Sequence, residues 1–126
     1  MHKIKITAGE IAVTARLNEM VTAARVWEIL PVTAPVNLWG EEIYFPIPLE
    51  TGPEKAQEVV VLGDIAYWPP GQAMCLFFGK TPVSRGKEIR PYSSVNIIGR
   101  IEGDPKVLAK VKEGETIVVE RMSNDA

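Results

Sequence analysis

The segment from Gly63 to Gly79 limits most strongly what this chain can fold into. Two short apolar runs, Ile65 to Trp68 and Ala73 to Phe78, flank the tripeptide Pro69-Pro70-Gly71. Short runs of apolar and aromatic residues bounded by proline and glycine are typical of strands joined by a turn. The segment therefore predicts two neighbouring strands of a β fold.

Alternation of polar and apolar residues predicts an antiparallel hairpin at the start of the chain. Lys3 to Thr7 and Ile11 to Leu17 both alternate with period two, and Gly9-Glu10 lies between them. Further strands are expected at residues 42–48, 59–62, 65–68, 73–78, 95–101 and 116–120. Residues 31–40 are interpreted as a connection and a turn, and residues 49–58 and 79–94 as loops.

Two helices are expected between these strands. Asn18 is a suitable N-cap for a helix whose apolar residues recur every three or four positions until Pro31 ends it. Asp104 is expected to cap a second, short helix with Pro105 at its first position. About eight strands and two helices indicate a mainly β fold, a closed eight-stranded barrel capped by the two helices.

Length and composition narrow the class of protein. A chain of 126 residues fits a single domain, residues 1–126, which at this size buries about two thirds of its unfolded surface. The formal net charge of -2 argues against nucleic acid or an anionic membrane as partner. No apolar run is long enough to span a membrane. A single cysteine and the lack of a leader sequence lead us to expect a cytoplasmic protein.

The residues available for catalysis or for ligating a metal are few. His2 is the only histidine, so neither a catalytic triad nor a histidine-rich metal site is supported. Cys75 lies in an apolar run and is interpreted as a small buried hydrophobe. Glu41 and Glu42 are adjacent and point to opposite faces of a strand, so we interpret them as a solvated turn. The glycines form no phosphate-binding pattern, and we expect no cofactor.

Several strings resemble the cyclophilin fold, and in particular the small atypical cyclophilin-like proteins of prokaryotes. Leu76-Phe77-Phe78 is similar to the Gln-Phe-Phe strand of cyclophilins, and residues 95–101 are similar to their His-Val-Val-Phe-Gly-Lys-Val strand. Residues 39–45 and 68–71 resemble the atypical group, and residues 107–122 resemble the closing helix and strand. The resemblance extends over nearly the whole chain and implies a cyclophilin-like barrel.

Ordinary cyclophilins are peptidyl-prolyl cis/trans isomerases, and the resemblance implies which positions would carry that activity. Phe78 matches the phenylalanine that forms the floor of the proline pocket. The glutamine position falls on Leu76 and the histidine position on Val95, and no arginine occurs between Arg25 and Arg85. Most of the polar catalytic groups are therefore missing, so little isomerase activity is expected.

The same comparison suggests a binding groove. On a strand Leu76 and Phe78 share one face while Cys75 and Phe77 share the other, and the family match assigns Leu76 and Phe78 to the groove. Trp68, Tyr92 and the loop from Lys80 to Tyr92 are expected to complete it.

Three functions remain open from the sequence. The leading hypothesis is a domain that binds a small molecule or an extended, proline-containing peptide. The second is a weak or divergent prolyl isomerase in which Arg85 or Arg90 replaces the missing arginine. The third is a structural or regulatory subunit of a hydrolase assembly, which would imply a protein partner.

Overall fold

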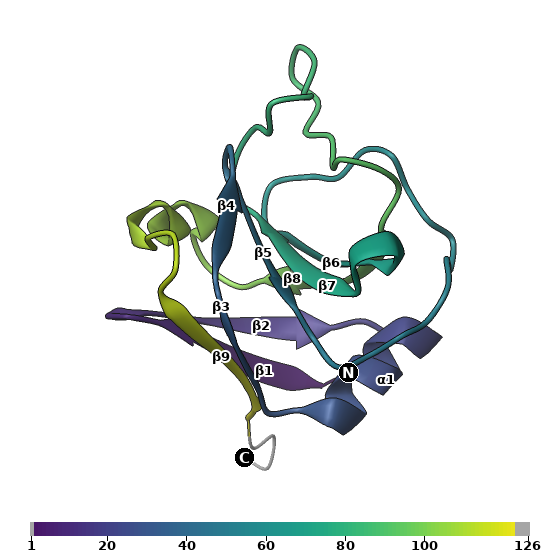
Figure 1. Cartoon of the computed structure of the whole chain (residues 1–126), viewed down its shortest axis with the longest axis vertical. Helices are drawn as coiled ribbons and strands as arrows, with labels where there is room; N and C mark the ends of the chain where they lie inside the picture. The colour runs from purple at the N-terminus through teal and green to yellow at the C-terminus, as the bar shows by residue number, and fades with distance from the viewer. Residues whose placement is uncertain (1, 123–126) are drawn as a thin grey trace.

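A computed structural model describes residues 2–122, and within them the chain forms a mainly β structure (Figure 1). The strands are β1 (Lys3–Ala8), β2 (Ile11–Leu17), β3 (Val32–Pro35), β4 (Asn37–Trp39), β5 (Glu42–Pro46), β6 (Asp64–Trp68), β7 (Ala73–Phe77), β8 (Asn96–Ile101) and β9 (Thr116–Arg121). The helical segments are α1 (Val21–Ile29), the single turn η1 (Pro69–Gly71) and the short 3-10 helix η2 (Pro105–Lys110).

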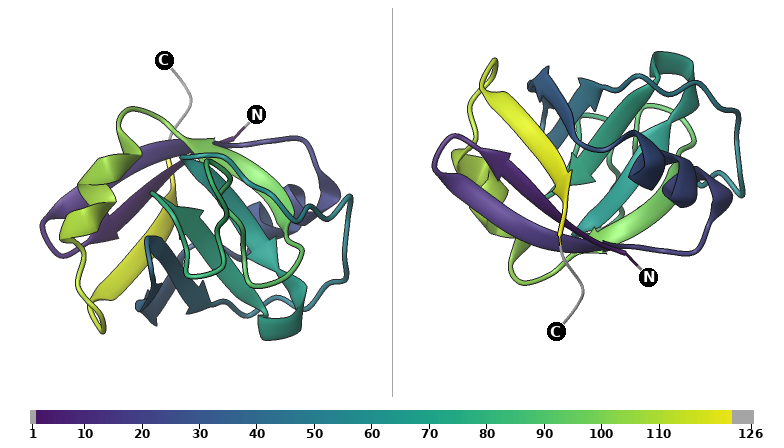
Figure 2. Two further views of the ribbon diagram at one scale, coloured as in Figure 1. Left: turned by 90° about the horizontal axis from the view of Figure 1, so that it is seen from above. Right: turned by 90° about the horizontal axis from the view of Figure 1, so that it is seen from below.

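All nine strands of the described chain belong to one antiparallel sheet, in the order β3-β9-β1-β2-β8-β6-β7-β5-β4. The strands at its two ends, β3 and β4, are separated in sequence by Val36 alone. The stretch at residues 32–39 therefore pairs first with β9 and then with β5. Hydrogen bonds from Val36 N to the Glu115 carbonyl and from Gly114 N to the Val36 carbonyl, both 2.9 Å, anchor the crossing. The sheet curls into a nearly closed barrel with its seam here (Figure 2).

The prediction of a barrel with two helices is confirmed, although the strand count is nine rather than eight. The extra strands β3 and β4 replace the predicted connection, because the chain around Val36 supplies backbone partners to both β9 and β5. Residues 59–62 do not form the predicted strand; there Val60 makes an isolated bridge to Ile89. Helices α1 and η2 lie on opposite sides of the barrel (Figures 1 and 2). No helix within residues 2–122 has the length and apolarity needed to cross a membrane.

The helix caps differ from each other in how well the sequence predicts them. Asp104 accepts a hydrogen bond from Lys106 N at 3.0 Å and caps η2 as predicted. The Asn18 side chain instead accepts from Met20 N, one residue before α1, and leaves the first helical amides free. The Glu54 carboxylate, from the loop before β6, takes those amides by accepting from Val21 N and Thr22 N. A long-range contact therefore performs the capping that a local residue was expected to perform.

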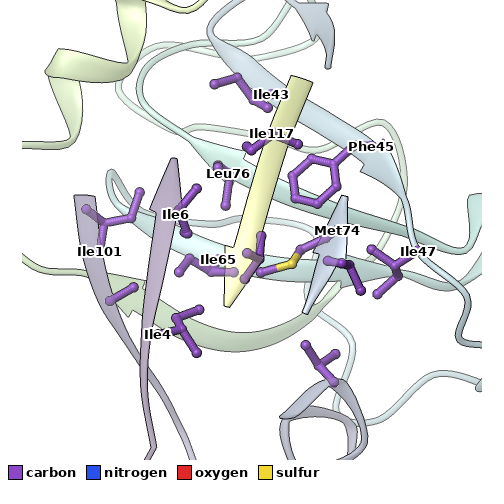
Figure 3. Close-up of a cluster of buried hydrophobic side chains, with 14 of the residues drawn as sticks. Ile4, Ile6, Ile43, Phe45, Ile47, Ile65, Met74, Leu76, Ile101 and Ile117 are labelled. Carbon is purple, nitrogen blue, oxygen red and sulfur yellow. The ribbon is translucent and has the colours of Figure 1, made fainter. Parts of the chain in front are cut away.

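The interior of the barrel is filled by aliphatic and aromatic side chains that alternate along the strands (Figure 3). On β5 and β7 the inward side chains are Ile43, Phe45, Met74 and Leu76, each fully buried. The opposite face of β6 and β7 is also covered, by a second cluster of six buried residues: Val60, Ala66, Cys75, Phe77, Ile89 and Val95. Ile89 of this outer cluster belongs to the loop at residues 79–94, which rises above the barrel at the top of Figure 1. The cluster lies between this loop and the sheet, next to the candidate site.

Candidate functional site

A cleft of about 260 Å³ lies on the outer face of the sheet, beside the second cluster. Its aromatic lining consists of Trp39, Tyr44, Trp68 and Tyr92. The rest of the lining consists of Glu42, Cys75, Pro91 and Val95. Four strands and one loop thus contribute side chains that lie far apart in the sequence.

Strand pairing explains why these residues meet. In the sheet Tyr44 on β5 is paired with Cys75 on β7, and Trp39 on β4 is paired with Glu42 on β5. Paired residues point to the same face of a sheet, as do residues two apart on one strand. Because Ile43 and Phe45 point into the barrel, Glu42 and Tyr44 must point outward, toward the cleft.

The rim of the cleft is formed by three aromatic rings. Tyr92 is 73% exposed, and its ring meets Trp39 and Trp68 edge-on at centroid distances of 5.9 and 5.8 Å. The indole Nε1 of Trp68 donates a hydrogen bond of 2.6 Å to Ser93 Oγ. Gly71 packs so closely on the Trp68 ring that an added Cβ would overlap it. The rings are therefore held in place while their surfaces remain available to a ligand.

Glu42 brings an acidic group into this apolar setting. The residue is only 5% exposed, and its Oε1 is buried with no hydrogen-bond partner within residues 2–122. Burial away from water raises the pKa of Glu42 to about 7, an effect partly offset by a hydrogen bond from the Cys75 thiol. The interpretation of Glu41-Glu42 as a solvated turn is therefore wrong for Glu42, because the loop at residues 79–94 covers its face of the sheet; Glu41 is exposed.

Cys75 behaves as the sequence predicts. It is 2% exposed, and burial together with the neighbouring Glu42 carboxylate raises the pKa of its thiol well above the usual value. The nucleophilic form of cysteine is the thiolate, which these surroundings disfavour. Cys75 contributes apolar surface and a weak hydrogen-bond donor to the cleft.

The loop at residues 79–94 is fixed by its own hydrogen bonds. The buried Thr81 hydroxyl donates to the Arg90 carbonyl, and Ser84 Oγ accepts from both Thr81 N and Arg90 N. The bridge between Val60 and Ile89 ties the same loop to the segment before β6. These contacts position Pro91 and Tyr92 as one wall of the cleft.

The two candidate arginines lie beside the cleft and not in its lining. Arg85 and Arg90 line a neighbouring depression of about 290 Å³, which shares Pro91 and Tyr92 with the cleft. Arg90 makes an ion pair of 3.0 Å with Glu88. Neither arginine is among the cleft-lining residues.

The four predicted binding residues are divided between two places. Trp68 and Tyr92 lie together in the cleft, 5.8 Å apart between ring centroids. Leu76 and Phe78 are 0% and 4% exposed and pack in the barrel core, so they do not line it. The cleft lies on the Cys75 side of β7, opposite the face of Leu76 that the family match assigns to a groove.

Sequence reasoning missed Trp39, Glu42 and Tyr44 as site residues. Two features of the sequence could have identified them. Residues 39–45 carry part of the family resemblance, and Glu42 and Tyr44 are two apart on one predicted strand and so share a face. Within residues 2–122, no three His, Cys, Asp or Glu side chains gather in a way that could hold a metal ion.

Comparisons with known proteins cover nearly the whole chain. A family model described as cyclophilin-like matches residues 2–120. The solution structure of a hypothetical protein from Archaeoglobus fulgidus is similar, with 42% identity, a TM-score of 0.83 and an alignment over 96% of this chain and 95% of that one. A search of curated proteins found no match.

Proposed function

This chain belongs to the cyclophilin-like family, and we propose that it is a binding domain whose outer cleft takes a small molecule or a short extended peptide segment. The exposed but anchored aromatic rim supports this proposal most directly. Tyr92 is 73% exposed although two indole rings and a hydrogen-bonded loop hold it in place. Concave aromatic surfaces with a few polar groups are typical of ligand sites.

The size of the cleft limits the ligand. Its volume of about 260 Å³ is slightly below the range of roughly 300–1,000 Å³ that drug-sized ligands occupy. A site of this size fits one or two amino-acid side chains, such as proline and its neighbour, or a compact small molecule. A folded protein partner would have to insert a single residue to use it.

The tryptophans allow binding to be measured directly. Trp39 and Trp68 line the cleft, whereas Trp27 lies elsewhere, stacked on His2 at 3.9 Å. In a Trp27→Phe background, fluorescence therefore reports on the cleft alone. Titration with Xaa-Pro tetrapeptides and with compact apolar fragments is expected to give a saturable change for at least one probe.

Two variants and one control make this experiment decisive. Tyr92→Ala and Trp68→Ala are expected to abolish the response, while Val21→Ala, at an exposed apolar position on α1, leaves it unchanged. Retained affinity in both rim variants, with folding verified by circular dichroism, would rule out the cleft as the binding site.

A prolyl isomerase activity is the second candidate, and one observation favours it. The depression that holds Arg85 and Arg90 shares Tyr92 with the cleft, so a bound prolyl peptide could extend toward a cation. Loss of one preorganised donor costs about 2.7–4 kcal/mol in well-studied sites, and here the family's glutamine and histidine positions are Leu76 and Val95. A weak rate on Xaa-Pro peptides that is lost in Arg85→Ala or Arg90→Ala would support the isomerase, and a parent rate at background would reject it.

A further inference from the structure

The cleft contains an acceptor that nothing in the described chain satisfies. Glu42 is 5% exposed, and its Oε1 has no hydrogen-bond partner. Buried carboxylates are ordinarily paired with a cation or held by several donors, because an unpaired buried charge is strongly unfavourable. The Cys75 thiol is a side-chain donor to Glu42, and a thiol is a weak donor.

Among the residues that the structure describes, no cationic side chain lies in the lining of the cleft. The lining consists of Glu42, four aromatic residues, Cys75, Pro91 and Val95. Arg85 and Arg90 line the adjacent depression, and Arg90 is paired with Glu88 at 3.0 Å. A positive charge beside the Glu42 carboxylate would therefore have to come from a ligand.

The walls around this carboxylate suit a cation. Three strands and one loop contribute four electron-rich rings: Trp39 on β4, Tyr44 on β5, Trp68 on β6 and Tyr92 in the loop. An organic cation is attracted to the face of such rings, tryptophan most strongly, and the attraction grows when water is excluded. Aromatic rings around a carboxylate favour a substituted ammonium group over a strongly hydrated metal ion.

We propose that the ligand bound in this cleft carries a substituted ammonium group, which is held by the Glu42 carboxylate and the surrounding aromatic rings. The inference rests on the proposed binding function and specifies its ligand class. The ammonium supplies the donor that Glu42 Oε1 lacks, and its alkyl groups pack against Trp39, Trp68 and Tyr92.

A neutral ligand is the competing case, in which protonated Glu42 donates a hydrogen bond to a ligand carbonyl. The two cases respond to pH in opposite ways. The pKa of Glu42 is about 7, so its carboxylate is largely ionised at pH 8 and largely protonated at pH 5.5. The other titratable groups that face Glu42 in the cleft are the Cys75 thiol and the Tyr44 and Tyr92 phenols, and none of them becomes a cation.

The test compares probes that differ in charge and hardly in shape. Choline and 3,3-dimethylbutan-1-ol form one such pair, and butylammonium and butan-1-ol form a second. Each is titrated into the Trp27→Phe protein and followed by fluorescence and by the indole Nε1 proton signals of Trp39 and Trp68. At pH 8 the cations are expected to bind at least tenfold more tightly than their neutral counterparts. Lowering the pH to 5.5 is expected to weaken the cations about tenfold or more, since only the ionised fraction binds them.

Glu42→Gln removes the charge while keeping the shape of the side chain, and Glu41→Gln is the matched control with the same loss of charge at the exposed neighbour. The cation preference is expected to disappear in Glu42→Gln and to persist in Glu41→Gln. The pH series on the parent protein gives the same information without any variant, should Glu42→Gln fail to fold.

The outcomes separate this inference from the proposed function. Equal affinity for charged and neutral probes, tighter binding at pH 5.5, or no binding of either cation would overturn the ammonium inference. If peptides or neutral probes still change the fluorescence of the cleft tryptophans, and Trp68→Ala and Tyr92→Ala abolish that change, the binding function stands without the ammonium inference. If no probe of any charge perturbs the cleft tryptophans, both proposals fail.

Discussion

The Cys75 thiol on the neighbouring strand hydrogen-bonds to the Glu42 carboxylate, whose oxygen Oε1 has no hydrogen-bond partner in the described part of the chain. A thiol is a weak donor, so this contact offsets little of the loss of water around the carboxylate. An acid with a pKa of about 7 therefore lies among aromatic side chains, and the stability of the folded state depends on its charge.

The stability of the protein is expected to fall as the pH rises from about 5 to 8. The pKa of Glu42 is raised from 4.5 to about 7 on folding, so in this window the folded protein keeps a proton that the unfolded chain releases. Above pH 7 the buried charge lowers the free energy of unfolding by about 3 kcal/mol relative to pH 4.5. Urea unfolding of the parent and of Glu42→Gln at pH 5.5 and 8 measures this, and the variant is expected to be the more stable at pH 8.

Glu41→Gln serves as the control for that experiment, because Glu41 is exposed and adjacent in sequence. The pH slope of Glu41→Gln should match that of the parent. If the free energy of unfolding of Glu42→Gln changes with pH as steeply as that of the parent, Glu42 does not have a raised pKa.

Gly71→Ala is expected to displace Trp68 without disturbing the barrel. A Cβ at Gly71 would overlap the Trp68 ring, and Gly71 has no positive φ that would add backbone strain. We expect roughly tenfold weaker binding of any probe that responds, equivalent to about 1.4 kcal/mol. The control is Gly52→Ala, where an added Cβ meets nothing within 4 Å. Unchanged affinity and an unchanged Trp68 signal in Gly71→Ala would show that the rim adapts.

Gly99→Ala is expected to destabilise the barrel itself. Gly99 on β8 is paired with Leu17 on β2, and a Cβ there would overlap the carbonyl oxygen of Arg16. Backbone atoms yield less readily than side chains, so the two strands must separate locally, at about 1–3 kcal/mol. Thermal and urea unfolding measure the loss. A melting temperature equal to that of Gly52→Ala would contradict the close approach of β2 and β8.

Asn96→Ala is expected to lower the free energy of unfolding by about 1–3 kcal/mol, because it leaves buried polar groups without hydrogen-bond partners. Asn96 is fully buried; its Oδ1 accepts from Glu54 N, and its Nδ2 donates to Thr22 Oγ1 and to the Gly52 carbonyl. These bonds hold the loop that caps α1, so hydrogen exchange at the Val21 and Thr22 amides should also accelerate. Gln57→Ala, at an exposed position of the same loop, is the comparison; equal stabilities would refute the role of Asn96.

Cys75 is expected to resist thiol reagents in the folded protein. It is 2% exposed and its pKa is raised well above the usual value, so little thiolate is accessible. Labelling with an aromatic disulfide should proceed only as fast as unfolding and become rapid in urea. Fast stoichiometric labelling under native conditions would show that the floor of the cleft opens readily.

Several features of the fold were predictable because they are local. Period-two alternation identifies β1 and β2, the flanking Pro69-Pro70-Gly71 turn identifies β6 and β7, and Asp104-Pro105 identifies the start of η2. In each case the deciding interactions lie within a few residues of one another. Strands β3 and β4 were not predicted, because residues 32–39 are extended only through their pairing with β9 and β5.

The sequence by itself determined which side chains share a face of each strand; it did not determine which face lines the cleft. Alternation groups Leu76 with Met74 and Cys75 with Phe77, and both groups are apolar. The tertiary structure decided between them: the curled sheet takes Leu76 and Met74 into the barrel, and the loop at residues 79–94 covers the side of Cys75 and leaves a cleft. The same covering buries Glu42, whose charge becomes significant only once long-range packing has removed water from it.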